Sequence, residues 1–94
     1  MARSLRQRLV LTAGDNDGTL DFGFDPEDVA KSYEVEVSVD PITPTSWQKK
    51  MTVTKSSGTI TGLTSGARMW VRVQAIGAHP QPGPYSDPAA KTVP

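Results

Sequence analysis

One stretch of the chain, from Met69 to Ile76, alternates strictly between two classes of side chain. The members on one side are Met69, Val71, Val73 and Ala75, and those on the other are Trp70, Arg72 and Gln74. Successive side chains of an extended chain point to opposite faces, so a period of two is typical of a β-strand with one buried and one solvent-facing side. The segment therefore predicts a β-sheet protein, although it does not indicate a particular function.

Further short segments with the same period are separated by turn-forming residues. The other expected strands are Leu5–Thr12, Leu20–Phe24, Tyr33–Val39, Trp47–Thr54, Ser56–Thr61 and, broken early by Pro88, Tyr85–Val93. Asp15–Gly18 has the composition of a tight turn, and a helix over Pro26–Lys31 would be a single turn. Seven short strands without a long helix favour an all-β, antiparallel β-sandwich.

The chain is short and has no cysteine. Its 94 residues suffice for one domain over residues 1–94, with residues 1–4 as a flexible or arm-like start. A chain of this size buries roughly 60–65% of its unfolded surface, which allows two packed layers but no deep cleft. Without cysteine there is no disulfide and no thiolate ligand or nucleophile, so stability must come from packing and strand pairing.

The N-terminal region has only a short apolar run, Leu9–Leu11. A secretory signal needs an apolar stretch of about 7–15 residues, and a membrane-spanning helix needs about 20. We therefore expect no signal peptide and no membrane span. An excerpt of a longer protein is at least as good an interpretation of this sequence as a natural start.

The formal net charge of zero hides a segregation of charges along the chain. Residues 1–14 hold three arginines and no acidic residue, residues 15–40 hold nine acidic residues against one lysine, and residues 41–94 hold six basic residues against one aspartate. We expect oppositely charged strands to lie side by side in one sheet and neutralise each other. The alternative is that the split guides head-to-tail association between copies of the chain.

Several motifs occur in one order along nearly the whole chain. They are Leu20–Pro26 with Phe24 in the place of a tryptophan, Tyr33–Val37, Trp47, the corner Leu63–Ala75, and the ending Gly83–Pro88 with Thr92–Pro94. In this order and spacing the chain resembles a fibronectin type III domain. The resemblance implies a seven-stranded antiparallel sandwich in which the third and sixth strands are neighbours. Glu34 and Glu36 would then face Arg72 and Arg68.

Two residues depart from the pattern of that family. Phe24 is smaller than the usual core tryptophan, so a larger neighbour must fill the space. Met69 stands where the family has a corner tyrosine, so the hydrogen bond from the tyrosine hydroxyl to the backbone, worth roughly 1 kcal/mol, cannot form. We expect the second departure to affect local rigidity more than the fold.

Signals for chemistry are weak. The only histidine, His79, lies in a Gly/Pro-rich segment, and a triad with Ser86 and Asp87 would lack the rigid support that catalysis needs. Asp15–Gly18 does not fit a calcium-binding EF-hand loop, because Ala13 and Phe24 would stand where carboxylates are required. We expect no catalytic residues, no metal site and no cofactor. Neutral charge with clustered acids disfavours nucleic acid as a partner.

Two groups of residues are candidates for binding. Trp70 is expected on the outward side between Arg68 and Arg72, a composition typical of a binding hot spot, although the arginine stems could simply cover the indole. The second group lies in the loop Gly77–Pro84, which joins the last two strands and often carries ligand contacts in fibronectin type III modules. Its candidate residues are His79, Pro80, Gln81 and Pro82.

The sequence thus predicts a non-enzymatic protein-interaction or spacer module whose partner is another protein or copies of itself. One alternative is a self-assembling structural subunit of a virion, tail or cell-surface filament. Another is a carbohydrate-associated accessory domain of a bacterial hydrolase, in which carbohydrate would be the partner. The resemblance favours an extracellular, cell-surface or virion location, although we expect no signal peptide in this chain.

Overall fold

The computed structural model describes residues 8–26, 30–77 and 85–94, and these residues contain seven strands and no helix. The strands are β1 Leu9–Ala13, β2 Leu20–Phe24, β3 Ser32–Val39, β4 Gln48–Val53, β5 Ser57–Ile60, β6 Arg68–Ile76 and β7 Ala89–Thr92. The prediction of seven strands is confirmed. Residues 5–7 of the expected first strand and residues 27–29 of the expected helical turn at Pro26–Lys31 lie outside the described residues.

The last strand differs most from its predicted bounds, because it begins at Ala89 rather than at Tyr85. Tyr85 forms only an isolated antiparallel bridge with Gln74. Pro88 lies between this bridge and β7, and proline has no N–H to donate to a ladder. Tyr85 and β7 therefore pair with β6 separately and do not form one continuous strand.

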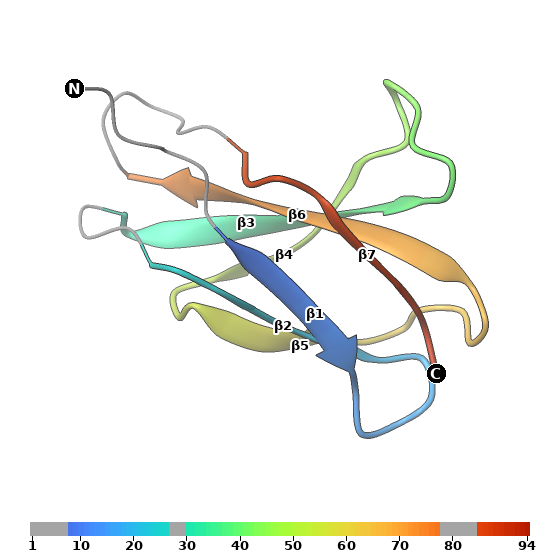
Figure 1. The fold of residues 1–94 in the computed structure, drawn as a ribbon. Coiled ribbons are helices and arrows are strands. Elements are labelled where there is room, and N and C mark those ends of the chain that lie inside the picture. The colour runs from blue at the N-terminus through green and yellow to red at the C-terminus, as the bar shows by residue number, and fades with distance from the viewer. Residues whose placement is uncertain (1–7, 27–29, 78–84) are drawn as a thin grey trace.

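The strands form two antiparallel sheets that pack face to face (Figure 1). The first sheet has the order β1-β2-β5, and the second has the order β4-β3-β6-β7. The third and sixth strands are therefore neighbours, as expected, and they pair from Ser32↔Ile76 to Val39↔Met69 without a register shift. The observed architecture is the predicted antiparallel β-sandwich.

The core lies between the two sheets and is built from the residues with period two. Its fully buried apolar side chains are Leu20, Val35, Ile60, Val71, Val73 and Val93. Phe24 packs edge-on against Tyr33, with 4.7 Å between ring centroids, and lies parallel to Phe22 at 6.1 Å. The space left by a phenylalanine at this position is thus bordered by two aromatic rings, whose edge-to-face and offset contacts stabilise the core.

One end of the sandwich is held together around Gly18. The Gly18 N–H donates to the Pro94 carbonyl at 2.9 Å, and the Gly18 carbonyl accepts from the Leu63 N–H at 3.0 Å. The Ser65 hydroxyl also donates to the Pro94 carbonyl, at 2.6 Å. These bonds join the β1–β2 turn, the β5–β6 loop and the second residue after β7, so the end of the described chain is fixed against two turns.

Gly18 and Gly66 form a matched pair for a stability test. Both have positive φ, 78° and 87°, which disfavours any residue with a Cβ by about 1–2 kcal/mol. A Cβ at Gly18 would lie 2.8 Å from the Leu63 carbonyl oxygen, whereas a Cβ at Gly66 would meet no atom within 4 Å. We expect Gly18→Ala to lower the free energy of unfolding by at least about 1 kcal/mol more than Gly66→Ala in urea denaturation, since an overpacked site adds to the conformational term. Equal losses would contradict the tight approach of Gly18 to Leu63.

Met69 occupies the position of the family's corner tyrosine and is 8% exposed at the edge of the core. We expect Met69→Tyr to leave the melting temperature unchanged or to raise it, because a hydroxyl there can bond to the backbone for roughly 1 kcal/mol. Met69→Phe is the control, since it adds a ring without the hydroxyl. A clear fall in the melting temperature of Met69→Tyr, with Met69→Phe unaffected, would show that this corner is built differently.

Candidate functional site

The outward face of the four-stranded sheet carries most of the aromatic and charged side chains that could contact a partner. The β3–β6 register places Glu36 opposite Arg72 and Ser38 opposite Trp70 on this face, while the valines between them point into the core. Period two in both strands thus assigns one face to packing and the other to polar and aromatic groups. Two groups of residues can be distinguished on the outward face.

The first group, which we name the Arg72 cluster, consists of Glu36, Trp47, Arg72 and Tyr85. The Arg72 guanidinium carbon lies 4.3 Å from the Trp47 ring centroid and 3.7 Å from the Tyr85 ring centroid. Its Nε and Nη2 atoms donate to Glu36 Oε1 at 2.8 and 2.7 Å. The arginine therefore contacts two aromatic rings and is paired with a carboxylate, so the cluster satisfies its own charge.

Tyr85 completes the cluster through its hydroxyl, which donates to Glu36 Oε2 at 3.2 Å. Burial, and after it the negative charge of Glu36, raise the pKa of Tyr85 above its ordinary value of 10.0. Tyr85 is held in place by the residue after it. The Ser86 N–H donates to the Val73 carbonyl at 2.7 Å, and the Val73 N–H donates to the Ser86 hydroxyl at 2.9 Å.

These contacts also bear on catalysis. Ser86 is buried, and its hydroxyl oxygen accepts the backbone N–H of β6, so it is engaged in holding the chain. His79, the other residue needed for a triad, lies outside the described residues. Nothing in the described part of the chain gives evidence of a catalytic arrangement.

The second group, which we name the Trp70 patch, lies at the end of the sheet where β3 stops and β6 begins. It consists of Asp40, Arg68 and Trp70. The Trp70 indole is half-buried and donates from Nε1 to Asp40 Oδ1 at 2.8 Å. In the loop after β3, Ile42 is 37% exposed. Val39 is 59% exposed, but it pairs with Met69 and therefore lies on the opposite side of the strand from Trp70.

Arg68 supplies the positive charge of the Trp70 patch. Its guanidinium carbon lies 5.8 Å from the Trp70 ring centroid, and its side chain is exposed. Within residues 8–26, 30–77 and 85–94, Arg68 forms no ion pair. Because Arg68 has no ion-pair partner among the described residues, its guanidinium can pair with a carboxylate of another molecule.

Arg68, Trp70 and Arg72 share the outward face of β6, as expected, and the guanidinium group of Arg68 lies near the Trp70 ring. Arg72 contacts Trp47 and Tyr85 instead, because the Glu36 carboxylate opposite it holds the guanidinium over β3. Sequence reasoning missed both rings, since Trp47 precedes β4 and Tyr85 lies outside regular strand, where a period of two carries no information. The candidates His79, Pro80, Gln81 and Pro82 lie outside the described residues.

The expected neutralisation between neighbouring strands is confirmed for two ion pairs. Glu36 pairs with Arg72 of β6, while Glu34 pairs with Lys49 of β4 at 2.8 Å. The expectation that Glu34 would face an arginine is wrong, because Glu34 lies opposite Gln74 and the nearest cation belongs to the edge strand on the other side. Arg68 lies opposite Thr92 of β7 and pairs with neither glutamate.

The acidic residues near β2 do not converge. Asp15 and Asp17 precede this strand and Asp25 follows it, so a strand of five residues separates them. A search of the described residues finds no group of three or more potential metal ligands. In the same residues, no helix has the length and apolar character to cross a membrane.

Comparisons with known proteins identify the fold. A scan against protein-family models finds no match, and a search of curated proteins finds none either. Among solved structures, a Fn3-like protein from Clostridium thermocellum is similar with a TM-score of 0.76 at 21% identity, covering 88% of this chain and 84% of that chain. The fn3 domain of the human collagen alpha-1(XX) chain gives a TM-score of 0.70 at 22% identity, with coverages of 94% and 83%.

Similar units also occur inside enzymes. Pectate lyase PelI from Erwinia chrysanthemi, in complex with tetragalacturonic acid, gives a TM-score of 0.74 at 13% identity, covering 92% of this chain but 28% of that chain. At such identities the likeness concerns the fold alone. The order of the strands, the two sheets and these neighbours agree, and the chain has the fibronectin type III fold.

Proposed function

We propose that this chain is a non-enzymatic module that binds a protein partner through the Trp70 patch and also serves as a spacer. The observation that carries the proposal is the Arg68 cation, which forms no ion pair among the described residues and lies 5.8 Å from the centroid of the Trp70 indole ring. Aromatic and arginine residues are enriched among those that dominate binding energy at protein interfaces. The chemistry of the patch suits a partner segment that offers a carboxylate next to apolar side chains.

The contrast with the Arg72 cluster supports this choice. Arg72 already has a carboxylate and two rings within its own domain, so a partner would gain little from its charge. The Trp70 indole is also fixed by Asp40, which means that little side-chain freedom is lost when a partner covers it. The loop after β3 projects beyond the sheets, so the patch is accessible from the side (Figure 1).

The arrangement of the outer strands supports the spacer role. β1 and β7 lie next to each other and run in the same direction (Figure 1). The described chain therefore enters at the end of the sandwich where β1 begins and leaves at the opposite end, where Pro94 is bonded to Gly18 and Ser65. Such a unit can be placed in series with other domains without folding the chain back on itself.

The partner-binding proposal can be tested with surface variants that keep the fold. Arg68→Glu reverses the positive charge, and Trp70→Ala removes the indole, so both should weaken partner binding by about tenfold or more. Proteins from the source organism would be captured on the immobilised domain, and the affinity of each purified candidate would then be measured by calorimetry. Thr59→Ala, on the outward side of the other sheet, is the matched control.

Unchanged affinity of the purified partner for Arg68→Glu and Trp70→Ala would overturn the role of the patch. The melting temperatures of all variants show whether a loss of binding reflects a loss of folding. Because Arg68 is exposed, Arg68→Glu should unfold at the same temperature as the unaltered domain.

The carbohydrate alternative is favoured by one observation, the similar unit within pectate lyase PelI. The same variants distinguish it, because a polysaccharide ligand would be retained by the unaltered domain on immobilised polygalacturonate and released by Trp70→Ala. Retention there without any protein partner would replace the protein-binding proposal. If the domain is not retained on polygalacturonate, only the protein-binding proposal remains to be tested.

A further inference from the structure

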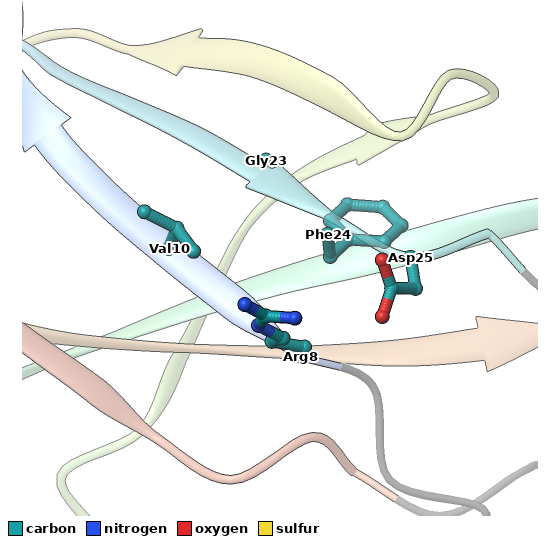
Figure 2. Close-up of a pocket in the computed structure, with 5 residues that line it drawn as sticks. All are labelled: Arg8, Val10, Gly23, Phe24 and Asp25. Carbon is teal, nitrogen blue, oxygen red and sulfur yellow. The ribbon is translucent and has the colours of Figure 1, made fainter.

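The outward face of the three-stranded sheet has a shallow depression of about 290 Å³, away from the Trp70 patch. Its lining residues are Arg8, Val10, Gly23, Phe24 and Asp25 (Figure 2). It lies between β1 and β2, where Val10 is paired with Gly23 in the register. This depression differs from the rest of the sheet in having an exposed aliphatic side chain beside a residue without a side chain.

The depression exists because Gly23 leaves the middle of the face uncovered. A Cβ at Gly23 would have the Ser56 carbonyl oxygen, 3.9 Å away, as its nearest neighbour, so the space above this residue is open. Val10, directly across from it, is consequently 53% exposed, a large value for an aliphatic side chain in a paired strand. The face thus presents an exposed valine next to a hollow.

Polar residues flank the Val10–Gly23 pair at both ends of the depression, at matched positions on the two paired segments. Leu9 pairs with Phe24, so the preceding Arg8 and the following Asp25 stand at one level along the strands. Figure 2 shows the Arg8 guanidinium and the Asp25 carboxylate at the same end of the depression. At the other end, Thr12 is paired with Asp21. Among the described residues Arg8 forms no ion pair.

We propose that this face binds a second copy of the chain about a two-fold axis that runs parallel to β1 and β2, between them. Such an axis places β1 of each copy over β2 of the other and keeps every residue at its own level along the strands. Val10 of each copy then enters the hollow over Gly23 of the other. A two-fold contact of this kind is self-complementary, since each residue pair occurs twice.

The same axis brings opposite charges together, and this charge complementarity identifies a second copy as the occupant. Arg8 of each copy lies over Asp25 of the other, and the Thr12 hydroxyl lies over Asp21 of the other, to which it can donate. The same two-fold rotation therefore places Val10 in the hollow over Gly23 and brings two polar contacts into register. These are the contact of Arg8 with Asp25 and that of Thr12 with Asp21. Two sheets stacked in this way are aligned, as in ordinary sheet-on-sheet packing.

The contact is weak by itself, because each copy contributes a single exposed aliphatic side chain. Its effect grows when the domain is linked to others, since a second contact between two linked chains is intramolecular. The face does not involve the Trp70 patch, so the dimer and partner binding are independent.

The association can be measured by sedimentation velocity over a wide range of protein concentrations at low salt. We expect a monomer–dimer equilibrium that shifts toward monomer as salt is added, because exposed charge pairs are screened. Gly23→Val fills the hollow and should abolish the dimer, and it should fold because the open space accommodates a side chain. Thr52→Val, which adds the same side chain on the exposed part of β4, is the control and should dimerise normally.

A charge exchange provides a second, independent readout. Arg8→Asp and Asp25→Arg, made singly, should each weaken the dimer by about tenfold or more, since like charges would face each other. Both changes in one chain should restore it. A monomer at every concentration, a dimer unaffected by Gly23→Val, or a double variant as weak as the single ones would overturn the proposal.

Discussion

The pairing of β3 with β6 is the contact on which the arrangement of this protein depends. Their register runs from Ser32↔Ile76 to Val39↔Met69 and fixes which side chains share a face. Val35, Val37, Val71 and Val73 then point into the core, and the side chains between them form the outward face. A slip of one residue would send every one of these side chains to the other face, so apolar burial and the composition of the surface specify the same register.

On the outward face, the two arginines of β6 have different roles because their surroundings differ. Arg72 lies opposite Glu36 and between the Trp47 and Tyr85 rings, so its charge is satisfied inside the domain and it stabilises the sheet. Arg68 lies opposite Thr92, forms no ion pair among the described residues, and has its guanidinium carbon 5.8 Å from the Trp70 ring centroid. Two arginines four residues apart in one strand therefore differ in whether the described part of the domain supplies an ion-pair partner.

The two sheets offer different kinds of surface. The four-stranded sheet presents rings and paired charges on a broad face, and its open part is confined to the end next to the β3–β4 loop. The three-stranded sheet presents a hollow over Gly23 beside the exposed Val10. With β1 and β7 running side by side in one direction, both faces stay accessible when the domain is placed in a series. A module of this shape can hold neighbours apart and still make lateral contacts.

The sequence alone determined the fold class, the approximate strand bounds and the inward side of the stretch Met69–Ala75, because period two is a local property and burial follows from it. It also indicated the outward position of Trp70 and its neighbour Arg68. Only the tertiary structure decided which cation meets which ring or carboxylate. Trp47 and Tyr85 contact Arg72 from segments outside the regular strands. Glu34 forms an ion pair with Lys49 on the neighbouring edge strand. Val10 lies opposite Gly23 in the pairing of β1 with β2. Such contacts join residues far apart in the chain and depend on register and side-chain direction, neither of which a local pattern contains.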